Sequence, residues 1–180
     1  MEPVIRRAVD ADVPAIARLR RDWTQEQLGR SADPDFEQRF AAWYAQEASR
    51  RIIWLAEVDG RVVGMVNLAV FERMPRPGRP ASCWGYLGNA FVLAEHRNQG
   101  IGQRLLDALL DHADRNGFAR VVLSPSERSI PFYQRAGFGA PTFSWCDEGG
   151  KCPPVPQARR LGVTDAIGRA GPARAEPRPP

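Results

Sequence analysis

The chain has 180 residues, a mass of 20.0 kDa and a formal net charge of +4. This length fits one compact domain with a tail, large enough to bury a core without disulfides or a metal. The whole positive excess lies in residues 151–180, because arginines and acids balance within residues 1–150. A specific nucleic-acid-binding face on the folded body is therefore not indicated.

Neither a membrane span nor a zinc site is predicted. The longest apolar stretch, residues 62–71, is interrupted by Gly64 and Asn67 and is too short to cross a bilayer. No charged segment followed by an apolar one marks a signal peptide at the N-terminus. Two histidines, and three cysteines without metal-ligand spacing, indicate free thiols and no metal, which favours a cytoplasmic protein.

The hydrophobic periodicity changes along the chain and predicts both helices and strands. Apolar residues recur at helical spacing after Pro14 and again after Pro34, whereas the pattern around Asp59-Gly60 predicts a hairpin. The expected elements are, in chain order, a strand at 4–7, a helix from 13, a helix after 34, strands at 52–58, 61–71 and 84–93, a helix at 102–116, a strand at 120–123, a short helix at 130–136 and a last strand at 138–145.

The composition divides the chain near Gly149. Residues 1–149 are expected to form one mixed α/β domain, since helices, an antiparallel hairpin and a strand–helix–strand unit follow one another. Seven of the sixteen prolines lie in the last thirty residues. Residues 150–180 are therefore predicted to be a basic tail that is disordered or loosely packed.

A strand, a glycine-containing loop and a helix follow one another between Phe91 and Leu106, and this arrangement can bind a phosphate. A helix N-terminus exposes about four unpaired N–H groups and a positive dipole end. Gly100 and Gly102 let a phosphate approach the backbone, and no acid between Arg97 and Leu106 repels it. The dinucleotide fingerprint lacks its third glycine and a Walker loop lacks its lysine, so neither of those sites is predicted.

Two segments resemble the GNAT superfamily of N-acetyltransferases. Arg97-Asn98-Gln99-Gly100-Ile101-Gly102 is similar to the family signature Arg/Gln-x-x-Gly-x-Gly/Ala, and residues 126–138 are similar to its Asn-x-x-Ala-x-x-Phe-Tyr-x-x-x-Gly-Phe segment. The resemblance covers residues 3–145 and implies an α/β (α+β) fold. Its parts are a mixed, mostly antiparallel sheet of six to seven strands, about four helices and a V-shaped split between the central strands.

The seventh strand departs from the family pattern. Prolines follow Gly150 closely, and proline resists pairing inside a sheet. Three alternatives stay open: the last strand is degenerate, is delayed to around residues 157–163, or is supplied by a partner.

The resemblance implies acetyl-CoA as the co-substrate, with no metal. Backbone groups of Val92 and Leu93 would pair with its pantetheine arm, and strands around 89–91 and 121–123 would splay to admit it. Ser126 stands where the family often has asparagine, and it offers fewer hydrogen-bonding groups. The residues assigned to the co-substrate are Val92, Leu93, Arg97, Asn98, Gln99, Gly100, Ile101, Gly102, Gln103 and Ser126.

The implied reaction is direct transfer of an acetyl group to a primary amine. Tyr133 would protonate the leaving thiolate, since a tyrosine of pKa about 10 is a suitable acid toward a thiol of pKa about 8.5. An amine of pKa near 10 must lose a proton, so a base is wanted. Glu72 and Glu57 are the candidates, and each also fits a solvated surface carboxylate.

The acceptor, a small-molecule or peptide amine, is expected beside the first two helices. Aromatic and acidic residues there fit a cationic amine, although core packing for the aromatics and a solvated face for the acids explain them better. They are Trp23, Trp43, Tyr44 and Trp84, with Glu26, Asp33, Asp35, Glu37 and Glu47. Two other classes stay open: a non-catalytic acyl-CoA-binding module of the same fold, and an interaction protein that acts through its basic tail. A homodimer is compatible with the sequence.

Overall fold

The computed structural model describes residues 2–30, 32–139 and 157–159. Five strands form a sheet in chain order, and neighbouring strands are antiparallel except for β4 and β5, which are parallel. They are β1 (Val4–Arg7), β2 (Arg51–Val58), β3 (Arg61–Glu72), β4 (Cys83–Val92) and β5 (Val121–Leu123).

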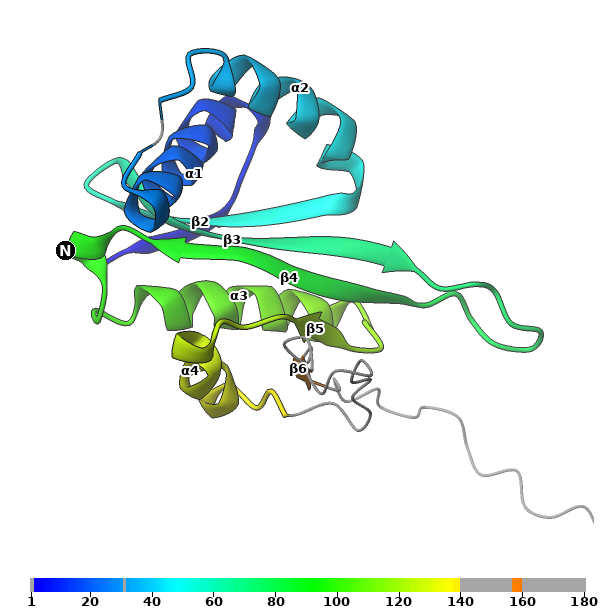
Figure 1. Ribbon diagram of the computed structural model, residues 1–180. Helices are drawn as coiled ribbons and strands as arrows, with labels where there is room; N and C mark the ends of the chain where they lie inside the picture. The colour runs from blue at the N-terminus through cyan, green and yellow to red at the C-terminus, as the bar shows by residue number, and fades with distance from the viewer. Residues whose placement is uncertain (1, 31, 140–156, 160–180) are drawn as a thin grey trace, which may run out of the picture.

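Four helices cover the two faces of this sheet. They are α1 (Val13–Leu28), α2 (Phe36–Glu47), α3 (Ile101–Arg115) and α4 (Ile130–Arg135). Helices α1 and α2 lie over one face, and α3 and α4 lie over the other (Figure 1). The mixed α/β fold and the order of its elements are those that the periodicity predicts.

The core lies on both faces of the central strands, which explains their nearly continuous apolar sequences. In β3, every residue from 62 to 69 is buried. Helix α3 packs a leucine-rich stripe on one face of the sheet, because its apolar residues recur every three or four positions. The fully buried side chains include Leu55, Leu68 and Leu109, which are each 0% exposed.

The β2–β3 hairpin turns at Asp59 and Gly60, as the sequence predicts. Both residues have positive φ angles, 51° and 76°, which suit the tight turn that joins two antiparallel strands. Arg61 pairs with Val58 directly after it. The turn sets the register between β2 and β3.

Strands β4 and β5 part after three residue pairs. Their ladder ends at Leu87 and Leu123, and β4 continues through Gly88–Val92 without a β5 partner. A β-bulge lies at the same place, where Asn89 and Ala90 of β4 stand opposite the single residue Val66. The backbone of Asn89 is in the left-handed region, with φ 53°. A bulge bends its strand, so it directs β4 away from β5.

The strand count differs from the sequence prediction of six to seven. Five strands lie within residues 2–139, and further along the chain Gln157–Arg159 (β6) pairs antiparallel with β5. This position is one of the three alternatives for the last strand. The strand expected at 138–145 falls outside the described residues except for its first two, and so does the tail except for β6.

Candidate active site

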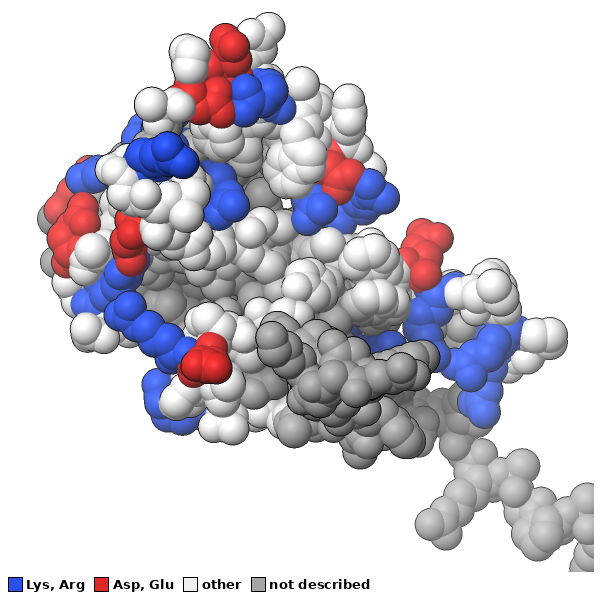
Figure 2. Space-filling view, in the orientation of Figure 1, with Lys and Arg blue, Asp and Glu red and all other residues white. Residues whose placement is uncertain are grey.

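A cavity of about 900 Å³ lies where β4 and β5 part. Its walls come from α1, β3, β4, the start of α3, the segment after β5 and α4. In Figure 2, charged side chains gather around the periphery of the molecule, whereas the middle of this face carries mostly uncharged ones. Because its walls run from α1 to α4, the cavity joins elements that are far apart in the sequence.

The alternation of β3 divides the cavity into two sides. A Cβ on Gly64 would meet Leu105 of α3, and Leu68 approaches Gly85, so even-numbered residues of β3 face α3. Odd-numbered residues consequently face α1 and α2. The "α1 side" of the cavity is lined by Trp23, Met65, Asn67, Ala69, Phe71 and Tyr86. The "α3 side" is lined by Gly102, Leu105, Ser126, Phe132 and Tyr133.

The glycine-containing loop has the geometry of an anion site at the α3 side. Gly100 is the N-cap of α3 with φ 79°, a conformation that favours glycine, and Asn98 has φ 59°. Helix α3 has no acid in its first turn and no side-chain cap, so its first N–H groups are free to bind an anion. A Cβ on Gly102 would lie no closer than 3.8 Å to Phe132, so the backbone there is open to a ligand.

The Arg97 side chain is not directed at this loop. Its Nη1 donates to Glu26 Oε1 of α1 at 2.8 Å, and its Nε donates to the carbonyl of Val92 at 2.9 Å. These hydrogen bonds hold the pKa of the Glu26 carboxyl below its usual range and raise the pKa of Arg97. The pair ties α1 to the end of β4, and the sequence analysis did not foresee it because 71 residues separate the partners.

Four of the ten residues assigned to acetyl-CoA line the cavity with their own atoms: Val92, Arg97, Gly102 and Ser126. The other six do not: Leu93, Asn98, Gln99, Gly100, Ile101 and Gln103. The Leu93 N–H donates to the Val63 carbonyl, and its own carbonyl accepts from His96. The Gln103 amide donates to Asp107 along the helix. The stretch of β4 without a β5 partner is Gly88–Val92, in which the Val92 carbonyl already accepts from Arg97 Nε.

Tyr133 lies on α4 and is 7% exposed. Its ring packs edge-on against Phe132 and Phe138, with ring centroids 5.0 and 5.8 Å apart. Burial raises the pKa of Tyr133 to about 12, because the charged phenolate loses solvation. The residue is held rigidly at the cavity wall in its neutral form, and it is a weaker acid than the sequence analysis assumed.

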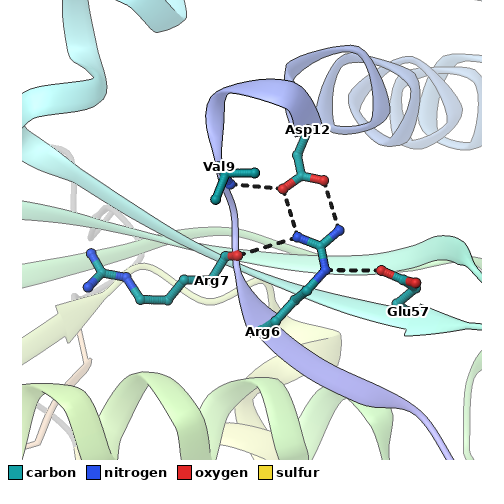
Figure 3. A network of polar contacts seen from close by, with 5 residues as sticks. All are labelled: Arg6, Arg7, Val9, Asp12 and Glu57. Atoms are coloured by element: carbon teal, nitrogen blue, oxygen red, sulfur yellow. Dashed lines mark hydrogen bonds and ion pairs between the residues drawn. The ribbon is translucent and has the colours of Figure 1, made fainter.

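Neither candidate base reaches the cavity. Glu72 is exposed at the end of β3, where it pairs with Cys83. Glu57 accepts a hydrogen bond at 3.0 Å from Arg6, which also donates to both oxygens of Asp12 at 2.7 and 2.8 Å. Figure 3 shows this network, in which Asp12 also accepts from the backbone N–H of Val9. Glu57 therefore holds β1 to β2.

The residues expected to bind the acceptor lie in different places. Trp23 lines the cavity and stacks on Phe91, with ring centroids 5.6 Å apart. Trp43, Tyr44 and Trp84 do not line it. Four of the five acids are ion-paired with arginines: Glu26, Asp33, Glu37 and Glu47. Within the described residues, Glu26 is the one acid on the cavity wall.

Asn67 is the polar wall residue that the sequence analysis missed. It is 4% exposed, and its side-chain Oδ1 is buried without a hydrogen-bond donor among the described residues. The sequence contains one signal for it, a lone amide inside the apolar stretch 62–70. That amide shows only that the stretch is interrupted.

The residues present fit acetyl-CoA. The α3 N-terminus offers amides to a pyrophosphate, the free stretch of β4 offers backbone groups to an extended arm, and a cavity of about 900 Å³ adjoins both. No group of three or more His, Cys, Asp or Glu residues that could hold a metal occurs in the described part of the chain. None of its helices is long and apolar enough to cross a membrane.

Comparison with known proteins identifies relatives. The model of the Acetyltransferase (GNAT) family matches residues 14–138. Glucosamine 6-phosphate N-acetyltransferase from Trypanosoma brucei brucei is 33% identical over 88 residues, which are 49% of this chain and 58% of that protein. Human N-acetyltransferase 8 is 35% identical over 89 residues, which are 47% of this chain and 37% of that protein. The chain thus matches about half the length, or less, of these curated relatives.

Solved structures show the same fold. A GNAT-family acetyltransferase from Streptococcus pneumoniae superposes with a TM-score of 0.66 at 22% identity, covering 89% of this chain and all of that one (100%). A predicted acetyltransferase from Clostridium acetobutylicum, crystallised with acetyl-CoA, superposes with a TM-score of 0.65 at 19% identity. The match covers 81% of this chain and 95% of that one.

Proposed function

The chain belongs to the GNAT acetyltransferase family, and we propose that it transfers an acetyl group from acetyl-CoA directly to a primary amine of a small molecule or a peptide. The observation that carries this proposal is the single cavity that joins the α3 N-terminus, the unpaired part of β4 and Tyr133. A cavity of this kind can hold the donor and the acceptor together, and alignment of two reactants supplies much of the rate of a direct transfer.

The loop and the strands would bind the donor. The first N–H groups of α3, with the open backbone at Gly102, would hold the pyrophosphate. Backbone groups of Gly88–Val92 would pair with the pantetheine arm where β5 is absent. Bound acetyl-CoA supplies the thioester whose acetyl group is transferred. An N–H group near the bulge at Asn89 and Ala90 would then polarise the thioester carbonyl.

Tyr133 would serve the leaving sulfur. With a pKa of about 12 its hydroxyl stays protonated at neutral pH, so a donor is always present. Full proton transfer to a thiolate of pKa about 8.5 is uphill from such a group. The main contribution would therefore be a hydrogen bond that strengthens as negative charge develops on sulfur.

The remaining features of the proposal concern the whole molecule. Residues 1–149 would form the catalytic domain and residues 150–180 a basic tail, with β6 as the segment that returns to the sheet. Cys83 is a free thiol, which agrees with a cytoplasmic location. A small-molecule or peptide amine would be the partner.

The deciding experiment measures CoA release from acetyl-CoA with a panel of amines: aminoglycosides, polyamines, amino acids, and peptides with a free N-terminus or a lysine. Release that depends on the amine supports the transferase and identifies its acceptor class. Calorimetric binding of acetyl-CoA without release from any amine would favour the non-catalytic acyl-CoA-binding module. Failure to bind acetyl-CoA would exclude both.

A further inference from the structure

We infer that Asn67 holds the acceptor amine, by accepting a hydrogen bond from its N–H group through Oδ1. This inference rests on the proposed function and deepens it. Asn67 is buried on the cavity wall, and its Oδ1 lacks a donor among the described residues. A buried polar atom without a partner destabilises a fold, so an unpaired acceptor inside an apolar strand points to a ligand.

The position of Asn67 separates it from the donor. Asn67 lies on β3 and faces α1 and α2, whereas the opening for the pantetheine arm lies between β4 and β5. Its partner across the ladder is Gly88, and the Tyr86 ring lies 3.4 Å from where a Cβ on Gly88 would be. The next β3 residue toward the N-terminus, Val66, stands opposite the bulge. Asn67 thus adjoins the bulge from the α1 side, where an acceptor would approach the thioester.

The chemistry of the amide selects the form of the amine. An amide oxygen accepts a hydrogen bond but takes no proton at ordinary pH. The one acid on the described wall, Glu26, is already in an ion pair with Arg97. A neutral amine fits this environment, whereas an ammonium ion would find no free carboxylate on the described wall.

The preferred acceptors are therefore amines that are substantially neutral near pH 7.5. An α-amino group has a pKa of about 8, so roughly a quarter of it is neutral at that pH. A lysine side chain has a pKa of about 10.4, so only roughly 0.1% is neutral. The site favours the first class by this difference alone, before any contact with the rest of the acceptor.

The test compares two variants of neighbouring residues on β3. Asn67→Leu removes the unpaired amide at nearly constant volume, so its Tm should equal or exceed that of the wild type. Its kcat/KM for the amine should fall about tenfold, the loss expected for one hydrogen bond to the substrate, while acetyl-CoA binding is unchanged. Leu68→Ala, on the opposite face and fully buried, should lower Tm and leave the KM for the amine unchanged.

A third variant tests the form of the amine. Two probes are used: a peptide whose one amine is its α-amino group, and the same peptide with that amine blocked and one lysine added. Asn67→Asp places a carboxylate at the same position, so kcat/KM for the lysine probe relative to the α-amine probe should rise at least about fivefold.

The outcomes separate the two proposals. A wild-type protein that acetylates no amine overturns the proposed function, and this inference with it. An active wild type with equal amine kinetics in Asn67→Leu overturns the inference alone. An unchanged ratio of kcat/KM between the two probes in an active Asn67→Asp variant would also overturn the inference alone. A fall in both Tm and acetyl-CoA binding for Asn67→Leu would show that Asn67 has a structural role, and this result would overturn the inference too.

Discussion

Two polar regions of the molecule differ in whether their hydrogen-bonding groups have partners. In the network at the start of the chain, Arg6, Asp12 and Glu57 satisfy one another, and Asp12 also accepts from Val9 (Figure 3). On the cavity wall, Asn67 keeps an acceptor without a donor among the described residues. The first arrangement stabilises the fold, whereas the second keeps hydrogen-bonding capacity for a ligand.

The comparison shows why charge alone does not identify the site. Two of the carboxylates that the sequence analysis singled out are paired with arginines, Glu57 with Arg6 and Glu26 with Arg97. The neutral polar groups of the cavity include a tyrosine, an amide and backbone N–H groups, and arginines such as Arg128 also line its wall. Changes to the paired region should act on stability, and changes to the cavity should act on turnover.

The largest effect is expected from Tyr133→Phe. Loss of the hydroxyl removes the hydrogen bond to the leaving sulfur and should lower kcat about 100-fold, within the range for acid catalysis. The ring keeps its packing against Phe132 and Phe138, so acetyl-CoA binding and Tm should stay near wild type. Steady-state kinetics with calorimetric binding check both points. An unchanged kcat would exclude the assigned role.

The paired region should respond in stability instead. Asp12→Ala leaves Arg6 and the Val9 N–H without their shared acceptor, and we expect a loss of about 2 kcal/mol in the free energy of unfolding. For a protein of this size that lowers Tm by about 4–8 °C. Urea unfolding measures the loss, and kcat at a temperature below both transitions serves as the control.

The pH dependence of that loss follows from the depressed pKa of Asp12. Hydrogen bonds from Arg6 hold this pKa below its usual range. Because the folded-state value is the lower one, the stabilisation is fully present above the unfolded pKa of about 3.9 and is lost as the pH falls toward the folded value. The stability difference between wild type and Asp12→Ala should thus be constant from pH 5 to 7 and shrink below about pH 4. A difference that stayed constant down to pH 2 would contradict the pairing.

A smaller effect concerns the ionisation of Tyr133. Its pKa of about 12 predicts that only about a tenth of it is phenolate at pH 11, whereas a tyrosine of ordinary pKa near 10 would be about nine-tenths ionised. The difference in ultraviolet phenolate absorbance between wild type and Tyr133→Phe measures this residue alone. A full phenolate signal by pH 11 would show that the hydroxyl is solvated rather than buried.

The smallest effects come from a matched pair of glycines in the loop. Gly100 has φ 79°, so Gly100→Ala should lower stability by about 1 kcal/mol and raise the KM for acetyl-CoA severalfold by shifting the loop amides. Gly102 has ordinary backbone angles and room for a Cβ, so Gly102→Ala should change the free energy of unfolding by less than about 0.5 kcal/mol. Equal effects of the two substitutions on KM would show that the left-handed residue does not shape the loop.

Local patterns predicted most of the fold. The hairpin at Asp59-Gly60, the amphipathic helix α3 and the loop before it were all expected, because each depends on residues within a few positions of one another. The split between β4 and β5 was expected from the family resemblance, and the structure places it directly after the Leu87–Leu123 pair. The sequence left the number of strands between six and seven, because the prolines after Gly150 obscure the pattern of the last strand.

The site was predicted less completely. Tyr133 and Gly102 line the cavity, whereas the Leu93 N–H donates to the Val63 carbonyl and the Gln103 amide donates to Asp107 along its helix. Glu57 looked available in the sequence because its partner Arg6 lies 51 residues away. No local pattern reports a contact of that kind.

The sequence by itself determined the order of helices and strands, the glycine-containing loop and the family, since these depend on periodicity and on short motifs. Only the tertiary structure decided which polar groups are satisfied. Hydrogen bonding depends on distance in space, and strands paired across the sheet bring together residues that the chain separates. The folded arrangement pairs Glu26 with Arg97 and Glu57 with Arg6, and it leaves the Oδ1 of Asn67 without a donor among the described residues beside the bulge of β4.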